Sequence, residues 1–295
     1  MLKGTFTALV TPFDQEGHLD ERGLKTLLEH QLESKVEGIV VIGSTGESAT
    51  LSDDEKTAII RIAKECIGSR KKLIVGTGCN CTKKTIEATK RAASLGADAA
   101  LVVTPYYNKP TQEGLFEHYE KVASSSDLPL ILYNVPGRCA VNLLPQTVQK
   151  LSKIPTIAGI KEASGSLPQM MELLELLPEF PVLSGDDILT LPLLVLGGQG
   201  VISVVSNLVP DDMAELVRAG LNHRWDEARK IHFQLLPLFR GAFIETNPIP
   251  IKSLMRFAGL PAGPCRLPLT MPDAEHERKL RHLYETLKLP LLTHG

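Results

Sequence analysis

The sequence has little excess charge of either sign. Its 295 residues carry 32 Lys and Arg against 34 Asp and Glu, which leaves a formal net charge of -2 at pH 7. Binding to nucleic-acid phosphates or to anionic lipid depends on a basic excess. We therefore expect neither a nucleic acid nor a membrane among the partners of this chain.

Cysteine is also scarce. The five cysteines are odd in number and widely scattered, unlike the framework of a disulfide-rich secreted protein. Cys79 and Cys81 are spaced C-x-C, but no second Cys or His pair lies near them to complete a zinc site, and the eight histidines are dispersed. These patterns predict a reducing compartment, the cytoplasm, and no bound metal.

Long uninterrupted hydrophobic runs are missing as well. The stretch 188–209 carries no charge, but Pro192 and the sequence Gly-Gly-Gln-Gly at 197–200 interrupt it. A buried helix, a turn and a strand fit this stretch better than a membrane span. The N-terminus lacks the length and the cleavage site of a signal peptide, so secretion has no support.

Eight short apolar stretches, rich in β-branched residues, alternate with amphipathic helical patterns. This alternation predicts βα units around a parallel sheet, and eight units favour closure into a (β/α)8 TIM barrel. An open doubly wound sheet is the main alternative, but no G-x-G-x-x-G motif follows a strand. The expected strands are Thr5–Val10, Gly38–Ile42, Leu73–Gly76, Ala99–Val103, Pro129–Tyr133, Ile157–Ile160, Val182–Ser184 and Gly200–Val204.

The helical patterns divide the chain into two expected units. Ser52 and Glu55 have the spacing of a capping box, which predicts a helix over Asp53–Ile67. After residue 224 the strand pattern ends. Residues 1–224 are therefore expected to form the catalytic barrel, and residues 225–295 a C-terminal helical domain. Its expected helices are Trp225–Arg240, Pro250–Ala258 and Asp273–Leu287.

Reacting groups of a (β/α)8 barrel collect at the C-terminal ends of its strands. Lys161 directly follows the apolar part of the sixth expected strand. Burial there would disfavour the ammonium form and leave a neutral amine that can attack a ketone, although an ion pair with a neighbour such as Glu162 is the alternative. Tyr133 ends the fifth strand, where its hydroxyl can transfer protons in the same cavity or simply belong to the core.

Three further places could serve the same cavity. The turn from Ser44 to Gly46 offers two hydroxyls and several N–H groups at a helix start, which suits a small carboxylate or simply caps a helix. Arg138 offers a bidentate fork for a second carboxylate, the alternative being a solvated loop arginine. Tyr106 and Tyr107 point in roughly opposite directions, so at most one should face the barrel mouth.

Taken in order, these motifs make the chain similar to the dihydrodipicolinate synthase and N-acetylneuraminate lyase family of Schiff-base-forming class I aldolases. The resemblance covers essentially the full length. It implies a (β/α)8 barrel with a helical C-terminal domain, pyruvate as substrate, no metal or organic cofactor, and a homotetramer built as a dimer of dimers. The matching segments are TALVTPF (7–13), GSTGES (43–48), VTPYYNKPTQEG (103–114), ILYNVPGR (131–138), GIKEASG (159–165), LSGDD (183–187), GVISVVSN (200–207) and NPIPIK (247–252).

The resemblance also implies catalytic roles. Lys161 matches the lysine that forms an imine with pyruvate, and Tyr133 matches the phenol that assists proton transfer. Ser44 and Tyr107 match the remaining hydroxyls of the family's proton relay, with Ser44 at a position that is usually Thr in the synthases. The counterpart of Tyr107 reaches into the site of a neighbouring subunit, so the resemblance implies a working unit of at least two copies.

The substrate-binding residues follow from the same resemblance. Thr45 matches the residue that holds the pyruvate carboxylate, and the main chain at Ile202 is a further pyruvate contact. Arg138 resembles the arginine with which the synthases bind the carboxylate of L-aspartate 4-semialdehyde. This match favours condensation of that aldehyde with pyruvate to 4-hydroxy-tetrahydrodipicolinate, in the biosynthesis of diaminopimelate and lysine.

Two other functions stay open at this point. The GSTGE sequence also occurs in sialic-acid lyases, and Cys139 stands where many synthases have Thr, which leaves an N-acetylneuraminate lyase or a 2-keto-3-deoxy sugar acid aldolase as alternatives. A non-catalytic pyruvate-binding regulatory protein is an alternative of another class. The presence of the imine lysine and of every relay hydroxyl argues against it.

Many relatives bind L-lysine as an inhibitor in an interface pocket, and part of that pocket is matched here. Where lysine-sensitive bacterial relatives often have His, His and Glu, this chain has Asp53, Lys56 and Lys84. The two lysines would repel the ammonium group of the effector, which Asp53 only partly offsets. We therefore expect weak or absent inhibition by lysine. The matching residues are Ser48, Ala49, Asn80 and Tyr106.

Overall fold

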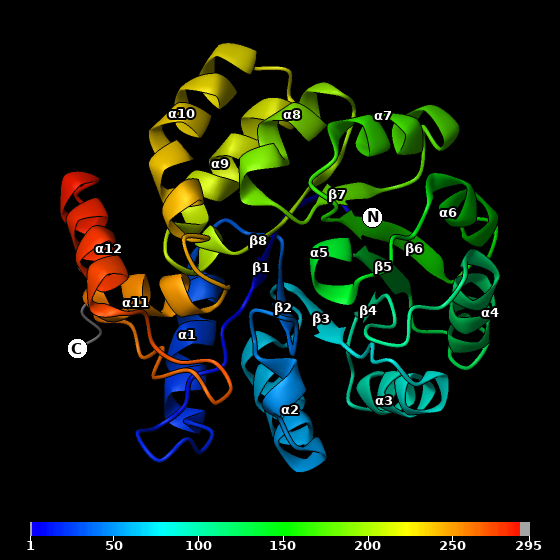
Figure 1. Cartoon of the computed structure of the whole chain (residues 1–295), viewed down its shortest axis with the longest axis horizontal. Coiled ribbons are helices and arrows are strands. Elements are labelled where there is room, and N and C mark those ends of the chain that lie inside the picture. Colours follow the sequence, from blue (N-terminus) through cyan, green and yellow to red (C-terminus); the bar gives the residue numbers. More distant parts are fainter. Residues whose placement is uncertain (1, 290–295) are drawn as a thin grey trace.

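Eight parallel strands close into a barrel in sequence order, with β8 paired to β1 (Figure 1). The structure is a computed structural model and describes residues 2–289. The predicted (β/α)8 fold is confirmed, with strand ends shifted by one or two residues. The strands are β1 (Gly4–Ala8), β2 (Gly38–Val41), β3 (Lys72–Gly76), β4 (Ala99–Val103), β5 (Leu130–Asn134), β6 (Ile157–Glu162), β7 (Val182–Ser184) and β8 (Gly200–Ser203).

Strand β6 ends two residues later than the sequence pattern predicts, which affects a candidate site residue. The sequence pattern placed Lys161 after the strand, whereas the strand continues through Lys161 to Glu162. The reason is pairing: Lys161 lies opposite Leu183 of β7, and Glu162 lies opposite Ser184. A polar residue can continue a strand where both neighbouring strands bind its main chain.

Helices cover the outside of the barrel (Figure 1). The predicted capping box is present, since Glu55 N donates to Ser52 Oγ (3.2 Å) and Ser52 N donates to Glu55 Oε2 (2.8 Å). The α-helices are α1 (Glu21–Glu33), α2 (Asp53–Ile67), α3 (Thr82–Ser94), α4 (Gln112–Ala123), α5 (Pro136–Cys139), α6 (Pro145–Leu151), α7 (Leu167–Leu176), α8 (Thr190–Val195), α9 (Pro210–Leu221), α10 (Trp225–Gly241), α11 (Ile249–Phe257) and α12 (Ala274–Thr286). Short 3-10 helices are η1 (Ser48–Thr50), η2 (Asp187–Leu189) and η3 (Val205–Asn207).

The uncharged stretch 188–209 contains the expected helix, α8, and the expected strand, β8, together with the end of η2 and the whole of η3. No helix within residues 2–289 is both long and apolar enough to cross a membrane.

The core has two layers that follow the alternation of side chains along each strand. On β5, Ile131 and Tyr133 belong to the cluster inside the barrel, whereas Leu130 and Leu132 pack outward under the helices. On β8, Ile202 lies inside and Val201 outside. A residue that alternates with outward-facing apolar neighbours is therefore aimed into the barrel.

The three helices predicted after residue 224 correspond to α10, α11 and α12. Helix α10 packs along α9 and reaches η2, while α11 contacts α12 and η3 (Figure 1). The division into units 1–224 and 225–295 stays a prediction, and residues 290–295 lie outside the described part of the chain.

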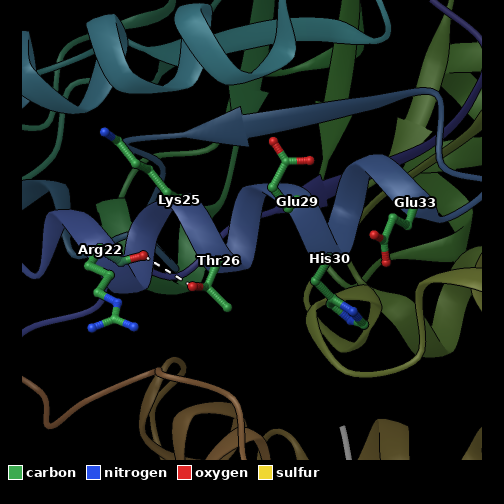
Figure 2. Close-up of a pocket in the computed structure, with 6 residues that line it drawn as sticks. All are labelled: Arg22, Lys25, Thr26, Glu29, His30 and Glu33. Atoms are coloured by element: carbon green, nitrogen blue, oxygen red, sulfur yellow. Dashed lines mark hydrogen bonds between the residues drawn. The ribbon is translucent and has the colours of Figure 1, made fainter. Parts of the chain in front are cut away.

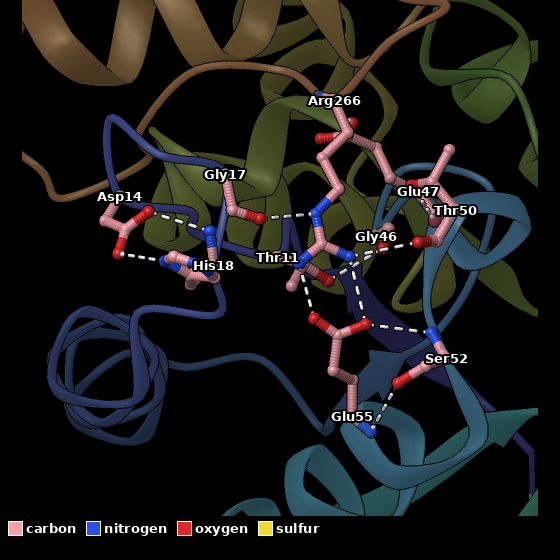
Figure 3. A network of polar contacts seen from close by, with 10 residues as sticks. All are labelled: Thr11, Asp14, Gly17, His18, Gly46, Glu47, Thr50, Ser52, Glu55 and Arg266. Atoms are coloured by element: carbon pink, nitrogen blue, oxygen red, sulfur yellow. Dashed lines mark hydrogen bonds and ion pairs between the residues drawn. The ribbon is translucent and has the colours of Figure 1, made fainter.

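Arg266, in the segment after α11, ties that segment to the loops around β1 and β2 (Figure 3). Its Nε donates to Gly17 O (2.7 Å), and its Nη1 donates to Thr50 O and to Glu55 Oε2 (3.0 Å each). A second bond joins Nη2 to Glu55 Oε1. These bonds from Arg266 are the main cause that lowers the pKa of Glu55 to about 2 from its ordinary 4.5.

This pair predicts a pH-dependent contribution to stability. Because the folded-state pKa of Glu55 is depressed, its contribution is complete above about pH 4.5 and is lost as the pH falls toward about 2. Glu55→Gln should lower the free energy of unfolding by about 1 kcal/mol near neutral pH, since the pair is partly exposed. In urea unfolding, the difference between wild type and variant should shrink as the pH falls from about 4.5 toward about 2.

Glu29→Gln is the matched control, because the Glu29–Arg70 pair is exposed on both sides. This variant should differ little from wild type at any pH. An equal loss for both variants, or a Glu55→Gln difference that does not change with pH, would contradict the assignment.

Candidate active site

Lys161 and Tyr133 lie side by side inside the barrel. They pair in register on β6 and β5, and each side chain is only 5% exposed. Lys161 Nζ lies 4.3 Å from the centroid of the Tyr133 ring. Since paired residues of neighbouring parallel strands point to the same side of a sheet, the register itself brings the amine to the phenol ring.

Glu162 is not the partner of Lys161. It points to the outer side of β6, where its carboxylate accepts hydrogen bonds from Asn134 Nδ2 (3.1 Å), Ser164 N (2.6 Å) and Gln169 Nε2 (3.2 Å). No ion pair links Lys161 to Glu162 in the described residues, so the ion-pair alternative for Lys161 is wrong. The physical reason is the alternation of side chains along a strand.

The end of β7 closes around the lysine. A Cβ at Gly185 would lie 2.9 Å from Lys161 Cε and 2.6 Å from Ala163 Cβ, so only glycine leaves room for the lysine side chain in this position. Next to it, burial raises the pKa of the Asp186 carboxyl, and the charge of Lys161 opposes part of that rise. The backbone here thus restricts where the amine can lie.

The turn after β2 carries Ser44 and Thr45. Thr45 is buried and Ser44 half-buried. Glu47 N donates to Ser44 O (3.1 Å), and Ser48 N donates to Gly43 O (3.3 Å). The expected position at the start of a helix is wrong, because the 3-10 helix η1 follows the turn and α2 begins only after its own cap at Ser52.

A cavity of about 650 Å³ lies beside this turn and the loops after β3 and β4. Ser44, Tyr106, Arg138 and Cys139 line it, together with charged residues of α2 and α3. Lys161 and Tyr133 do not line it but lie inside the barrel. The predicted site residues therefore lie in two places: Lys161 and Tyr133 inside the barrel, and Ser44 and Arg138 at this cavity.

Arg138 and Tyr107 differ in how the chain holds them. Arg138 is exposed on α5, and its Nη2 donates to the carbonyl oxygen of Asn247 (2.8 Å), so it is anchored rather than freely solvated. Of the two adjacent tyrosines, Tyr106 lines the cavity, whereas Tyr107 is 88% exposed with a φ of +74°. In the described residues, the tyrosine in contact with Lys161 is Tyr133 and not Tyr107.

Sequence reasoning had assigned no role to two buried polar residues at this end of the barrel. Asn247 Nδ2 donates to Thr45 Oγ1 (2.9 Å). Asp187 accepts from the main-chain N–H groups of Val204 (3.0 Å) and Val205 (3.2 Å), and burial raises its pKa to about 6. Asn247 lies in the segment NPIPIK and Asp187 in the segment LSGDD, and both segments match the family. That match is the sequence signal that could have pointed to these two residues.

Two other features lie apart from this site. A shallow hollow of about 310 Å³ runs along α1 and is lined by six residues of that helix alone (Figure 2). Glu245, Asp273 and His276 bring possible metal ligands within 4.8 Å of one another near the start of α12. There, Asp273 accepts from His276 N (2.8 Å) and His276 Nδ1 bonds Glu245 Oε1 (2.7 Å). No predicted site residue belongs to either feature.

The closed parallel barrel makes this a (β/α)8-barrel protein, and a buried lysine lies beside a tyrosine near the C-terminal ends of adjacent strands. The profile of the dihydrodipicolinate synthetase family matches residues 1–287, and the chain belongs to this family.

Similar proteins agree along the whole chain. A 4-hydroxy-tetrahydrodipicolinate synthase from Protochlamydia amoebophila is 51% identical, over 100% of this chain and 99% of that protein. One from Methanothrix thermoacetophila is 50% identical, over 95% of each. The solved structure of the synthase from Methylacidiphilum fumariolicum is 46% identical, covers 98% of this chain and 96% of that one, and superposes with a TM-score of 0.95.

Proposed function

We propose that this protein is a lyase that condenses pyruvate with L-aspartate 4-semialdehyde to 4-hydroxy-tetrahydrodipicolinate, in the biosynthesis of diaminopimelate and lysine. The observation that carries the proposal is Lys161, buried in the barrel with its Nζ 4.3 Å from the Tyr133 ring centroid. Family membership and synthases that are 50% and 51% identical support it. The scattered free cysteines favour the cytoplasm as its compartment.

The chemistry follows from a buried amine next to a phenol. Lys161 Nζ attacks the keto carbon of pyruvate, and loss of water gives an imine. The protonated imine nitrogen accepts the electron pair left when a methyl proton departs, so it does the work for which other enzymes use an organic cofactor. The resulting enamine carbon then forms a bond to the aldehyde carbon. The Tyr133 hydroxyl transfers protons in these steps.

The remaining site residues bind the substrate carboxylates or transfer protons. Thr45 and the main chain of Ile202 hold the pyruvate carboxylate, and Ser44 connects Tyr133 to Tyr107 in the hydroxyl relay. Arg138 binds the carboxylate of the aldehyde substrate. Sugar aldehydes lack that carboxylate, which favours the synthase reaction over the lyase and sugar acid aldolase reactions. All these side chains are present, which favours an enzyme over a silent pyruvate-binding protein.

Reduction with borohydride in the presence of pyruvate should attach a three-carbon unit to Lys161, because reduction makes the imine permanent. Peptide mass spectrometry identifies the modified residue. Lys161→Ala should lose the label and at least about a thousandfold in activity, the scale expected when a covalent nucleophile is removed. Lys71→Met, which alters a half-buried lysine at the opposite end of the barrel, is the matched control.

The same enzyme, offered pyruvate with aspartate semialdehyde or with N-acetylmannosamine, should consume only the first aldehyde. Labelling at another lysine would contradict the imine assignment. Consumption of N-acetylmannosamine alone would overturn the choice of aldehyde and support the lyase instead.

We also propose a homotetramer built as a dimer of dimers, in which Tyr107 of one copy completes the site of another. The support in this chain is its exposure: Tyr107 is 88% exposed, next in sequence to the cavity-lining Tyr106. A relay hydroxyl in that position acts only on a second copy of the chain.

Subunit complementation tests this arrangement. Tyr107→Phe and Lys161→Ala should each be nearly inactive when purified alone. In mixed dimers, the subunit with Tyr107→Phe keeps its own Lys161 and receives an intact tyrosine from its partner. Random mixing should therefore restore about a quarter of wild-type sites. Failure to recover activity in dimers shown to have exchanged subunits, or a fully active monomer in sedimentation, would contradict the proposal.

The cavity beside the turn bears on regulation by L-lysine. Lys56 and Lys84 line it, and they place two positive charges where an effector ammonium would bind. The negative charge of Asp53 compensates these two positive charges only in part, because Asp53 is already paired. Arg91 Nη2 lies 3.1 Å from its Oδ1, and Lys56 Nζ lies 3.9 Å from the same oxygen. The hydrogen bond from Arg91 is the largest cause that lowers the pKa of Asp53.

L-lysine should therefore inhibit the wild type weakly or not at all. Lys56→His combined with Lys84→Glu should tighten inhibition by about tenfold or more, the effect of about 1.4 kcal/mol of removed repulsion. Initial rates across a lysine titration measure the inhibition of the wild type and of the double variant. Lys72→Met, at an exposed pair at the far end of β3 from the cavity, serves as control. Strong inhibition of the wild type would show that the charge argument is wrong.

A further inference from the structure

The turn that carries Ser44 and Thr45 is held from outside the barrel. Three contacts join it to residues 247–266, which follow the barrel in the chain. Asn247 Nδ2 donates to Thr45 Oγ1 (2.9 Å), Lys252 Nζ pairs with Glu47 Oε1 (2.5 Å), and Arg266 N donates to Glu47 Oε2 (2.9 Å). The segment NPIPIK thus contributes its first and last residues to one turn.

Glu47 and Lys252 form an ion pair that is almost completely removed from water. The side chain of Lys252 is 0% exposed and that of Glu47 is 1% exposed. Lys252 Nζ also donates to Pro264 O (2.8 Å) and lies 4.5 Å from the centroid of the Phe13 ring. A buried charge that loses its partner is strongly destabilising, so each residue constrains the position of the other.

The backbone of the turn needs such support. Ile42 and Glu47, which flank Ser44 and Thr45, have φ values of +59° and +53°, a region that residues with a Cβ rarely adopt. Such conformations persist only where the surrounding structure holds them. Gly76 packs directly against the turn, since a Cβ there would lie 2.0 Å from Ile42 O. Packing supports the turn at Ile42, and residues 247–266 support it at Thr45 and Glu47.

Asn247 reaches both proposed carboxylate sites at once. Its side chain binds the Thr45 hydroxyl, while its main-chain oxygen accepts from Arg138 Nη2 at 2.8 Å. The residue is buried, with 5% of its surface exposed. Replacing the side chain therefore removes the contact to Thr45 and leaves the main-chain contact to Arg138.

We propose that Asn247 and Lys252 are positioning residues for pyruvate: Asn247 orients the Thr45 hydroxyl, and Lys252 holds the same turn through Glu47. This inference rests on the proposed function, in which Thr45 binds the pyruvate carboxylate. Both residues act through the turn and do not touch the reacting atoms.

Asn247→Ala should raise the KM for pyruvate by about tenfold, the effect expected from one lost buried hydrogen bond. The KM for aspartate semialdehyde should change by less than about twofold, because the main-chain bond to Arg138 stays. Asn222→Ala is the matched control, since the Asn222 side chain donates to Arg218 O at the exposed C-cap of α9. A general loss of structure would instead affect both substrates alike.

A double-mutant cycle makes the test specific to Thr45. If Asn247 acts through the Thr45 hydroxyl, adding Asn247→Ala to Thr45→Val should change the KM for pyruvate by less than about twofold further. Effects that multiply in the double variant would show that Asn247 does not act through Thr45, and an unchanged KM in Asn247→Ala would also overturn the proposal.

The ion pair is tested by removing both charges together, in Glu47→Gln with Lys252→Met, so that no buried charge is left alone. This variant should also show a raised KM for pyruvate, while borohydride still labels Lys161 at saturating pyruvate. A folded double variant with wild-type kinetics would overturn the role of Lys252. If it does not fold, the Asn247 and Thr45 cycle decides the proposal.

Labelling of the wild-type protein distinguishes a failure of this proposal from a failure of the proposed function. If wild-type protein is not labelled at Lys161 by pyruvate and borohydride, the proposed function fails. If it is labelled and Asn247→Ala shows the same pyruvate dependence, only the positioning role fails.

Discussion

Barrel closure is the constraint on which the site depends. Eight parallel strands in sequential order bring eight strand ends to one mouth, and the register between them decides which side chains meet. The pairing of Tyr133 with Lys161 follows directly from that register. The alternation along β6 then aims Lys161 inward and Glu162 outward, so adjacent charged residues in sequence serve the barrel interior and its outer surface.

Charged groups buried around the mouth are each matched by polar partners. Glu47 is paired with Lys252, Glu162 is bonded by Asn134, Ser164 and Gln169, and Asp187 accepts two main-chain N–H groups at the end of β8. Lys161 differs from them: it forms no ion pair in the described residues, its Nζ lies 4.3 Å from the centroid of the Tyr133 ring, and its charge acts on the Asp186 carboxyl. In the proposed function, such an amine can react without first displacing a carboxylate.

Local patterns predicted the elements well where a single segment carries the signal. The capping box of Ser52 and Glu55 placed the start of α2, and the C-terminal helical stretches were found within a few residues. The sequence-based predictions were wrong where contacts between distant segments determine the local structure. Strand β6 runs on through Lys161 because both neighbouring strands bind it, and the Ser44–Gly46 turn lies before a 3-10 helix that no local pattern had indicated.

The sequence by itself determined the fold class, the family resemblance and the chemical types of the candidate residues, because apolar periodicity and contiguous motifs are local properties of the chain. Only the tertiary structure decided which of those residues meet. The contact between Asn247 and Thr45 joins residues 202 positions apart, and the exposure of Tyr107 depends on how the loop after β4 leaves the barrel. Such contacts depend on the path of the whole chain through space, which the spacing of residues along a single sequence does not specify.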